Sequence, residues 1–316
     1  MRLGTEFRGK KILVTGALGF IGRSLLETLV VNGCEAELHG IDIKEMATDA
    51  EILKQRVRFD RIDIRDEQNV SAYVRDNCFD GVVHLAAVSR VVDAENDKRK
   101  CIDTNYGGTK HVVEAVSQNA GAWLVFGSSR EVYGEQTNFP VSEGAELLPI
   151  NVYGFYKLEG ERIVRRLLER YCILRFSNVY GNTYDIPERV VPKFVRTAMD
   201  GGEISLEGGE QIIDFTHIDD TVASVVKCME LLDCGCMKQD VIHVLPGRQN
   251  RITDVVDVLR KLGFSFSVAK RPSRAYDVQK FVGDPAKCNK VLWNGAMRFT
   301  ELQDGIERLV DLYRNS

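Results

Sequence analysis

The chain has 316 residues, of which 44% are apolar and 28% are charged, and its formal net charge is −4. This length allows one large domain or two modest ones with a proper core, and the composition is that of an ordinary globular protein. No block of basic residues indicates a surface for nucleic acid, so a polyanionic partner is expected to be small and locally bound.

Short apolar runs alternate with amphipathic stretches over the first 181 residues. The apolar runs are typical of buried strands, and the amphipathic stretches have the periodicity of helices. Strands that alternate with helices indicate a parallel, doubly wound α/β sheet of the Rossmann type. The expected strands are 12–16, 37–43, part of 57–66, 81–89, 122–129 and 171–181, and the expected helices are 23–33, 69–77, about 98–119 and 151–170.

The pattern changes after residue 181, where shorter helices and strands follow one another. We expect a Rossmann domain formed by residues 1–181 and about 217–243, the second piece beginning with a helix. A smaller, discontinuous substrate domain would comprise about 182–216 and 244–316. It would rest on the carboxyl ends of the strands, where such sheets bind ligands.

The eight cysteines are dispersed and form no paired CxxC motifs. This usage is typical of reduced thiols in a cytoplasmic protein and predicts no metal centre. The N-terminus lacks the apolar core of a signal peptide, and no apolar run approaches the roughly 18 residues of a membrane span. We therefore expect a soluble, cytoplasmic protein that binds neither a membrane nor nucleic acid.

Three glycines, Gly16, Gly19 and Gly22, form a GxxGxxG pattern between the first expected strand and the first expected helix. A tight turn needs the conformational freedom of glycine, and a pyrophosphate needs bare backbone N–H groups at a helix N-terminus. Asp42 ends the next strand, 20 residues after Gly22. An acid there accepts hydrogen bonds from the adenosine ribose and repels a 2′-phosphate, which predicts NAD rather than NADP. The alternative for Asp42 is a solvated strand-end carboxylate.

Two further polar residues belong to the predicted strands. Asp63 ends the third strand and would sit beside the adenine, with the N-cap of a helix over 66–77 as its alternative. His84 lies in an apolar strand, and we interpret it as a core histidine rather than a ligand.

Tyr153 and Lys157 lie four residues apart in the helix expected over 151–170, so they share one face, whereas Tyr156 points elsewhere. An ammonium beside a phenol favours the phenolate and lowers the pKa of the tyrosine from about 10. The phenolate would then be a general base for an alcohol proton, while the same carbon loses a hydride to a nicotinamide. Ser129, at the end of the fifth strand, could hydrogen-bond the same oxygen.

A series of motifs runs along nearly the whole chain: TGALGFIG (15–22), GID (40–42), DIRD (63–66), HLAA (84–87), NYGGT (105–109), SSREVYG (128–134), YGFYKLEGE (153–161), RFSNVYG (175–181), DFTHIDD (214–220) and a tail from Trp293 into TELQDGIERLVDLY. In these motifs and their order the chain resembles the extended short-chain dehydrogenases/reductases of the NAD-dependent epimerase/dehydratase family, which act on nucleotide sugars. The resemblance implies a homodimer in which the helices over about 98–119 and 151–170 pair as a four-helix bundle.

The resemblance also implies roles for individual positions. The residues that it implies for NAD binding are Gly16, Gly19, Phe20, Ile21, Gly22, Asp42, Asp63, Ile64, Leu85, Ala86, Ala87, Asn105, Tyr153 and Lys157. Those that it implies for catalysis are Ser129, Tyr153 and Lys157, and those for binding a nucleotide-diphosphate sugar are Ser89, Asn178 and Arg274.

Members of this family share a first step, the oxidation of sugar C4 to a 4-keto intermediate, and then diverge. An epimerase returns the hydride to the other face, whereas a 4,6-dehydratase removes a C5 proton and loses the C6 hydroxyl. Dehydratases have Thr-Asp-Glu or Thr-Ser-Glu before VYG, and this chain has Ser129-Arg130-Glu131. If the chain stays extended there, Glu131 faces the same way as Ser129 and could be the C5 base. The alternative is a carboxylate that orders the loop.

A second departure concerns the substrate. The family usually has an arginine that grips the substrate phosphates just before DF-x-x-x-D, and Ile213 occupies that place here. Arg274 resembles the second phosphate-binding arginine of the family and could compensate. We predict an NAD-dependent nucleotide-sugar 4-epimerase. The alternatives are a 4,6-dehydratase that uses Glu131, a keto-sugar reductase, and a catalytically idle subunit that binds NAD or nucleotide sugars.

Overall fold

The computed structural model describes residues 7–46 and 50–315. The chain forms two compact units by its internal contacts. The first unit consists of residues 1–132, 151–175 and 222–242, and the second consists of 133–150, 176–221 and 243–316. The second unit thus includes the segment 133–150, which the sequence placed in the Rossmann domain.

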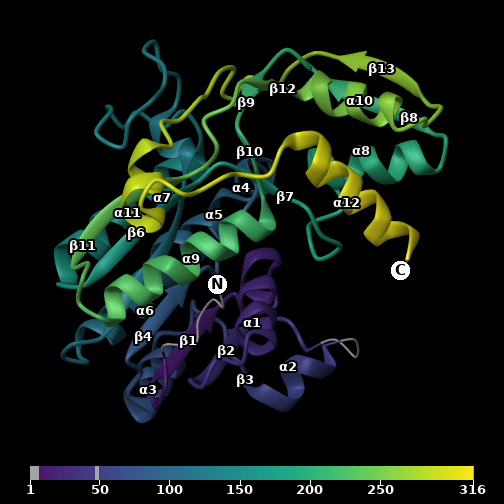
Figure 1. Cartoon of the computed structure of the whole chain (residues 1–316). Helices are drawn as coiled ribbons and strands as arrows, with labels where there is room; N and C mark the ends of the chain where they lie inside the picture. Colours follow the sequence, from purple (N-terminus) through teal and green to yellow (C-terminus); the bar gives the residue numbers. More distant parts are fainter. Residues whose placement is uncertain (1–6, 47–49, 316) are drawn as a thin grey trace. The chain divides into compact units, whose positions relative to one another are not determined.

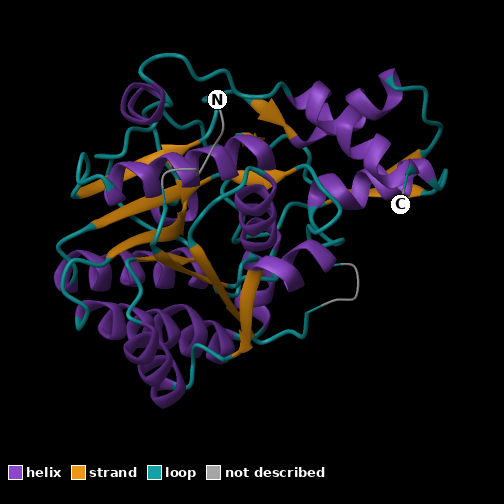
Figure 2. Ribbon diagram, turned by 60° about the horizontal axis from the view of Figure 1, so that its bottom comes forward, coloured by secondary structure: helices purple, strands orange, loops and turns teal. Residues whose placement is uncertain are grey.

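The first unit is built on a seven-stranded sheet whose strand order is β11-β6-β5-β4-β1-β2-β3 (Figures 1 and 2). Strands β1 to β5 pair in parallel with their sheet neighbours. This order and direction confirm the predicted Rossmann fold. The strands are β1 (Lys11–Thr15), β2 (Glu37–Asp42), β3 (Val57–Arg61), β4 (Gly81–His84), β5 (Trp123–Ser129), β6 (Tyr171–Phe176) and β11 (Gln239–Val244).

One hydrophobic cluster joins the sheet to three helices, α3 (Glu67–Asn77), α6 (Thr109–Ser117) and α7 (Val152–Leu167). It includes Leu13 and Leu124 from the strands and Val70, Val113 and Ile163 from the helices. Figure 1 shows α1 (Phe20–Val31) and α9 (Ile218–Asp233) on the other face, so apolar side chains are buried on both faces. The short helices are α2 (Glu51–Arg56), α4 (Val91–Asn96) and α5 (Lys98–Cys101).

The helix expected over about 98–119 forms without interruption over 98–117, but its middle part is π-helical. It consists of α5, a π-helical stretch η1 (Ile102–Gly108) and α6. Ile64 packs closely against Gly108. A Cβ added to Gly108 would lie 2.5 Å from the Cδ1 atom of Ile64. The wider turn carries Asn105, and such π segments are frequent at functional sites.

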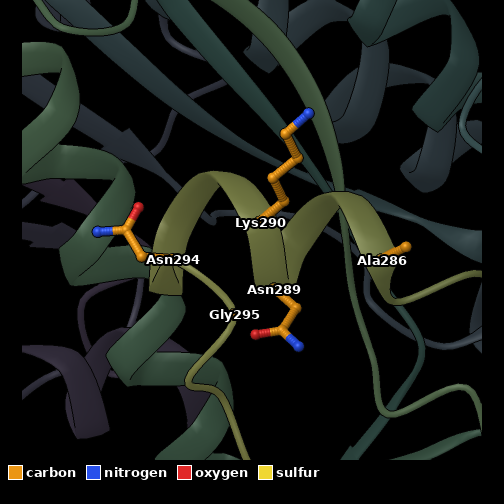
Figure 3. A pocket seen from close by; sticks show the side chains of 5 residues that line it. All are labelled: Ala286, Asn289, Lys290, Asn294 and Gly295. Atoms are coloured by element: carbon orange, nitrogen blue, oxygen red, sulfur yellow. The ribbon is translucent and has the colours of Figure 1, made fainter.

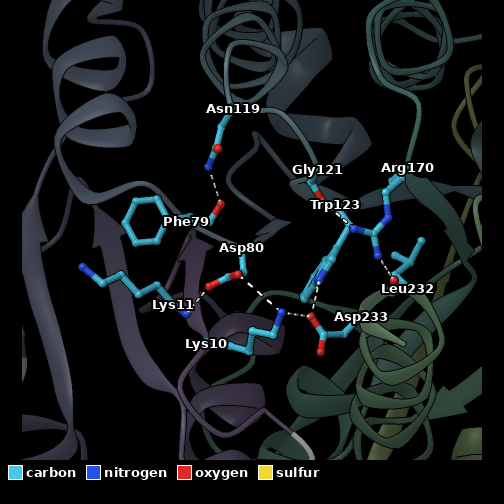
Figure 4. Close-up of polar contacts among 10 residues, drawn as sticks. All are labelled: Lys10, Lys11, Phe79, Asp80, Asn119, Gly121, Trp123, Arg170, Leu232 and Asp233. Atoms are coloured by element: carbon cyan, nitrogen blue, oxygen red, sulfur yellow. Dashed lines mark hydrogen bonds and ion pairs between the residues drawn. The ribbon is translucent and has the colours of Figure 1, made fainter. Parts of the chain in front are cut away.

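Polar contacts tie together the strand ends opposite to the carboxyl edge (Figure 4). The backbone N–H of Lys11 donates to Asp80 at 2.8 Å, and the Lys10 ammonium lies 3.4 Å from both Asp80 and Asp233. The indole N–H of Trp123 donates to Asp233 at 3.1 Å. These contacts join β1, β4 and β5 to the end of α9.

The second unit has its own hydrophobic core, in which β7 (Asn178–Tyr180) pairs in parallel with β10 (Phe215–His217). Strand β8 (Glu203–Glu207) pairs in parallel with β13 (Ser267–Arg271), and β9 (Ile212–Ile213) pairs antiparallel to β12 (Asn250–Arg251). Its helices are α8 (Val190–Met199), α10 (Ile252–Lys261), α11 (Ala286–Trp293) and α12 (Leu302–Arg314). Within residues 7–46 and 50–315, no helix combines the length and the apolar character needed to cross a membrane.

The strand boundaries differ from the sequence prediction in two places. The stretch 171–181 was expected as one strand, but it forms β6 in the large sheet and β7 in a separate two-stranded sheet. The seventh strand, β11, was not expected. Its sequence QDVIHV is short and follows a helix without a strong turn signal apart from Gly235.

The turn after β1 leaves no room for a side chain at Gly22. A methyl group on Gly22 would lie 2.2 Å from the Gly16 carbonyl oxygen, so Gly22→Ala forces the backbone to shift. We expect the free energy of unfolding to fall by roughly 1–3 kcal/mol in urea denaturation. Gly144→Ala is the control because a Cβ there meets no atom within 4 Å, and its effect should stay within about 0.5 kcal/mol. Equal stability of the two variants would contradict the packing of this turn.

Candidate active site

The glycine turn lies between β1 and α1. Gly16 has a φ of +67°, and a Cβ on it would lie 2.8 Å from the backbone nitrogen of Ala86. Gly19 is the N-cap residue of α1, and its N–H donates to the Gly16 carbonyl at 2.9 Å. Phe20, Ile21 and Gly22 form the first turn of α1. The turn therefore presents bare backbone at a helix N-terminus, which suits an anionic ligand.

Asp42 is not a solvated carboxylate, because only 8% of the residue is exposed. It accepts hydrogen bonds from the backbone N–H of Leu18 at 3.0 Å and of Lys44 at 3.0 Å. The carboxylate thus connects the end of β2 to the glycine turn. This geometry excludes the alternative of a solvated strand end.

Asp63 does not cap the helix that follows it. The N-cap of α3 is Asp66, whose side chain accepts from the backbone N–H of Asn69 at 3.1 Å. Asp63 instead binds the side chain of Arg65, and this hydrogen bond lowers the pKa of the Asp63 carboxyl. The neighbouring Ile64 is buried in the core of the first unit.

Residues 85–89 follow β4 rather than belonging to it, contrary to the predicted strand 81–89. The backbone N–H groups of Leu85 and Ala86 donate to the Thr15 hydroxyl, each at 3.2 Å. Asn105 holds the same segment, since its amide exchanges hydrogen bonds of 2.8 and 3.0 Å with the backbone of Val88. Ala87 is half-buried, and Ser89 is exposed.

His84 is satisfied by the fold, as predicted for a core histidine. Its ring nitrogens lie 2.7 Å from the Thr15 hydroxyl and 3.0 Å from the Thr109 hydroxyl. Burial lowers the pKa of His84 to about 3, and the Lys157 charge adds to this effect. The imidazole is therefore neutral and joins β1, β4 and α6.

Tyr153 and Lys157 lie on α7, and Lys157 is held against β5. Its ammonium donates to the Gly127 carbonyl at 2.7 Å and lies 5.9 Å from the centre of the Tyr153 ring. Only 5% of Lys157 is exposed, and burial lowers the pKa of its ammonium to about 8. The amine therefore titrates near physiological pH. Its charge, when present, favours a phenolate at Tyr153.

The end of β5 meets the start of α7. The Ser129 hydroxyl accepts from the backbone N–H of Glu131 at 3.2 Å. The Glu131 carbonyl lies so near Gly154 that an added Cβ would be 2.4 Å away. Ser129 thus ends the strand beside the first helical turn, which carries Tyr153.

The chain does not stay extended after β5, as the hypothesis of a C5 base at Glu131 assumed, because Arg130–Tyr133 form a 3-10 helix, η2. Glu131 is buried, and both of its carboxylate oxygens have partners. Oε1 lies 2.9 Å from the Arg130 guanidinium, and Oε2 accepts from the Asn151 amide at 2.7 Å. Asn151 also caps α7, since its side-chain oxygen accepts from the backbone N–H of Gly154 at 2.8 Å. Sequence reasoning missed Asn151, although an asparagine directly before a helix is a recognised N-cap signal.

Two predicted substrate residues belong to the second unit. The backbone N–H of Asn178 donates to the Asp214 carbonyl at 3.1 Å. Arg274 forms a close ion pair with Glu207. Ile213 is 3% exposed and belongs to the hydrophobic core of this unit. The position of the expected arginine is therefore a core position in this chain.

One pocket lies on α11, and none of the residues that line it is among the predicted site residues. Figure 3 shows its lining, in which the Lys290 side chain and the amide of Asn289 point in different directions. Asn289 accepts a hydrogen bond from the backbone N–H of Met297 at 3.0 Å, so this amide supports the local loop. The residues that line the pocket are Ala286, Asn289, Lys290, Asn294 and Gly295.

The chain is similar to known enzymes in both sequence and fold. The family model described as "NAD dependent epimerase/dehydratase family" matches residues 12–239. The UDP-glucose 4-epimerase of Lactobacillus helveticus is 26% identical over 305 residues, which cover 89% of this chain and 91% of the relative. The structure of the UDP-glucose 4-epimerase from Thermotoga maritima with UDP-glucose has a TM-score of 0.87 and 26% identity, and the match covers 96% of this chain and 99% of that one.

A dehydratase is similar as well. The dTDP-glucose 4,6-dehydratase from Streptomyces venezuelae, solved with NAD and TYD bound, has a TM-score of 0.86 and 27% identity, with 97% of each chain covered. The resemblance inferred from the motifs is thus confirmed. Since the family model spans well over half of the sequence, this chain belongs to the NAD-dependent epimerase/dehydratase family.

Proposed function

We propose that the chain is an NAD-dependent 4-epimerase of nucleotide sugars that acts through a transient 4-keto sugar. The observation that carries this proposal is the pair on α7. Lys157 lies 5.9 Å from the Tyr153 ring and is anchored to β5 by the Gly127 carbonyl. A phenol with a buried ammonium beside it is equipped to take a proton from an alcohol. The similar epimerases support the choice of substrate class.

The glycine turn fits NAD. A side chain at Gly16 or at Gly22 would collide with the backbone. The turn therefore leaves its main-chain N–H groups uncovered for a ligand that approaches the backbone. Asp42, fixed by the turn itself, would accept hydrogen bonds from the adenosine ribose. A nicotinamide held there would supply the group that takes up a hydride and gives it back. The residues proposed to hold NAD are those implied by the resemblance, from Gly16 to Asn105, together with Tyr153 and Lys157.

The transfer of the hydroxyl proton would be carried out by residues of the protein. Tyr153 as phenolate takes the proton of the sugar C4 hydroxyl while the C4 hydrogen leaves as hydride. Lys157 stabilises the phenolate charge, and Ser129 hydrogen-bonds the same sugar oxygen. Reversal on the other face of the keto sugar returns both hydrogens, so C4 is inverted and the mass of the sugar is unchanged.

The surroundings of Glu131 favour epimerisation over 4,6-dehydration. A C5 base needs a carboxylate that accepts a proton readily, and each oxygen of Glu131 already has a partner, Arg130 at one and Asn151 at the other. A neighbouring guanidinium stabilises the carboxylate and weakens it as a base. Position 130 is also an arginine, which cannot donate a proton to a leaving hydroxyl. Glu131 is therefore proposed to order the loop between β5 and α7.

The second unit is proposed to help bind the substrate through Asn178 and Arg274, while the first unit binds NAD. With Ile213 buried in the core, Arg274 would be the main phosphate-binding arginine, and it must leave Glu207 to reach a diphosphate. Ser89 is proposed as a contact for the sugar. All eight cysteines are free thiols, and we propose a reducing, cytoplasmic location.

A matched pair of tyrosine variants tests the base. Tyr153→Phe removes the phenolic oxygen, so turnover should fall by about 10²–10⁴-fold or more. Tyr156→Phe makes the same change three residues further along α7 and should leave turnover within about twofold, because spacing from Lys157 excludes that oxygen from the reaction. Both rates are measured with a UDP-sugar panel, and the NAD content of each variant is checked. Full turnover of Tyr153→Phe would refute the mechanism.

Product analysis separates the two candidate reactions. Incubation with UDP- and dTDP-hexoses should give a product of unchanged mass and inverted C4 by mass spectrometry and NMR. Glu131→Gln should keep that product and lower its rate by no more than about tenfold, whereas a carboxylate base would cost about 10²–10⁴-fold. A product that has lost one water, and whose formation requires Glu131, would identify a dehydratase instead.

We also propose a homodimer through helices of the first unit, those over about 98–119 and 151–170. An aromatic patch, formed by Tyr106, Phe155 and Tyr156, lies on these helices. The ring centres of Tyr106 and Tyr156 are 6.2 Å apart, and those of Phe155 and Tyr156 are 5.1 Å apart. Phe155 is 46% exposed and Tyr106 is 38% exposed. Large exposed aromatic residues gathered on one face are typical of an interface.

Phe155→Glu would place a charge in the centre of this patch. We expect the mass measured by light scattering to fall from that of a dimer to that of a monomer, because a buried unpaired charge is costly at an interface. Leu312→Glu is the control, since Leu312 on α12 is similarly exposed, at 45%, but lies outside the patch. A wild-type chain that is already monomeric would contradict the proposal, as would a Phe155→Glu variant that stays dimeric.

A further inference from the structure

Glu161 is a fully buried carboxylate on α7, one helical turn after Lys157. Its Oε1 accepts hydrogen bonds from the Ser128 hydroxyl at 2.6 Å and from Nε of Arg175 at 2.9 Å. Its Oε2 accepts from Nη2 of Arg175 at 2.7 Å and lies 3.6 Å from the Arg165 guanidinium. The carboxylate therefore joins α7 to β5 through Ser128 and to β6 through Arg175.

This ion pair is an unusual choice for stability alone. Arg175 is 1% exposed and Glu161 is not exposed at all, so both charges are removed from water. The cost of burying two charges commonly matches or exceeds their attraction, and apolar side chains of similar volume often stabilise a core at least as well. Unlike apolar packing, a bidentate ion pair fixes the distance and the relative orientation of its two side chains.

The proposed reaction depends on the position of α7 relative to the end of β5, and the Glu161–Arg175 pair helps to fix that position. Tyr153, Lys157 and Glu161 follow one another at four-residue intervals and so lie along one side of α7. They face consecutive residues at the end of β5: Lys157 binds the Gly127 carbonyl, Glu161 binds the Ser128 side chain, and Ser129 follows. Gly160 brings the two elements close, since a Cβ there would lie 2.7 Å from the Phe126 ring.

Glu161 also contributes charge near the Lys157 ammonium. The other groups that face this ammonium are His84 on β4, Cys101 on α5 and the Tyr153 phenol. His84 is neutral, and burial raises the pKa of Cys101 to about 11, so both are uncharged near pH 7. Two groups oppose the effect of burial on the pKa of Lys157, first the Cys101 thiol and then the Glu161 carboxylate, and of these two it is the carboxylate that carries a negative charge near pH 7.

We propose that Glu161 is a positioning residue for the proposed reaction: its bonds to Arg175 and Ser128 hold α7 in register on β5, and its charge keeps Lys157 protonated beside Tyr153. It does not touch the substrate or the cofactor. The inference rests on the proposed function for its effect on turnover, but its effect on Lys157 can be measured without any substrate.

The test compares three forms of the full-length protein. Glu161→Gln keeps the side-chain shape and removes the charge. Glu161→Leu combined with Arg175→Met removes both buried charges and keeps an apolar core, so it guards against a variant that merely fails to fold. Arg165→Gln is the control, because it removes a half-exposed charge 3.6 Å from Glu161 without breaking a buried hydrogen bond.

Two readouts are followed for each form, together with the thermal midpoint. The first is the ¹⁵Nζ shift of Lys157 against pH, assigned with Lys157→Arg. The second is kcat and KM against pH. For Glu161→Gln we expect the Lys157 titration and the alkaline limb of kcat to move to lower pH by about one unit, and kcat at pH 7.5 to fall by about tenfold or more with little change in KM.

The double variant should regain the wild-type thermal midpoint while its kcat stays low, and Arg165→Gln should match the wild type in both readouts. A double variant with wild-type stability and wild-type kcat would overturn the proposal, as would an unchanged Lys157 titration in Glu161→Gln. If the wild-type chain inverts no sugar but Glu161→Gln still shifts the Lys157 titration, the proposed function fails and the role of Glu161 toward Lys157 stands.

Discussion

The attachment of α7 to the end of β5 is the contact on which the candidate site depends. The helix supplies the phenol and the ammonium, and the strand supplies the serine and the carbonyl that holds the ammonium. Neither element defines a site alone, because a tyrosine and a lysine at helical spacing are common on protein surfaces. The attachment removes Lys157 from water, and the resulting cost of its charge brings the pKa to about 8.

The same sheet prepares the nucleotide end of the site by a different means. At the glycine turn, backbone approaches backbone so closely that side chains are excluded at Gly16 and Gly22. Asp42 is held by the N–H of Leu18, a residue of that turn. The turn and the acid are therefore one rigid feature, although 20 residues separate Asp42 from Gly22. Both parts of the site rely on close packing in the first unit.

The sequence predicted what depends on local periodicity and on residue type. Alternating strands and helices indicated the doubly wound sheet, and the glycine spacing indicated the turn. It could not predict features that depend on which side chains meet in three dimensions. The π-helical stretch arises where Ile64 packs on Gly108, and the partners of Glu161 lie 33 and 14 residues away along the chain. Asp63 was ambiguous because two aspartates, Asp63 and Asp66, precede α3, and only the backbone geometry shows that Asp66 is the cap.

The places where the chain departs from its family have physical explanations of different kinds. At position 131 the family's carboxylate is retained, but Arg130 and the N-cap residue Asn151 bind it, so a group that could serve as a base instead fixes the start of α7. At position 213 the expected arginine is replaced by an apolar residue that fills the core of the second unit. The contacts of Glu131 hold the helix that carries Tyr153, whereas the Ile213 side chain has no polar group that could bind a phosphate. The two departures therefore lie in different units, since the bonds of Glu131 join the end of β5 to the start of α7 in the first unit and Ile213 packs in the core of the second.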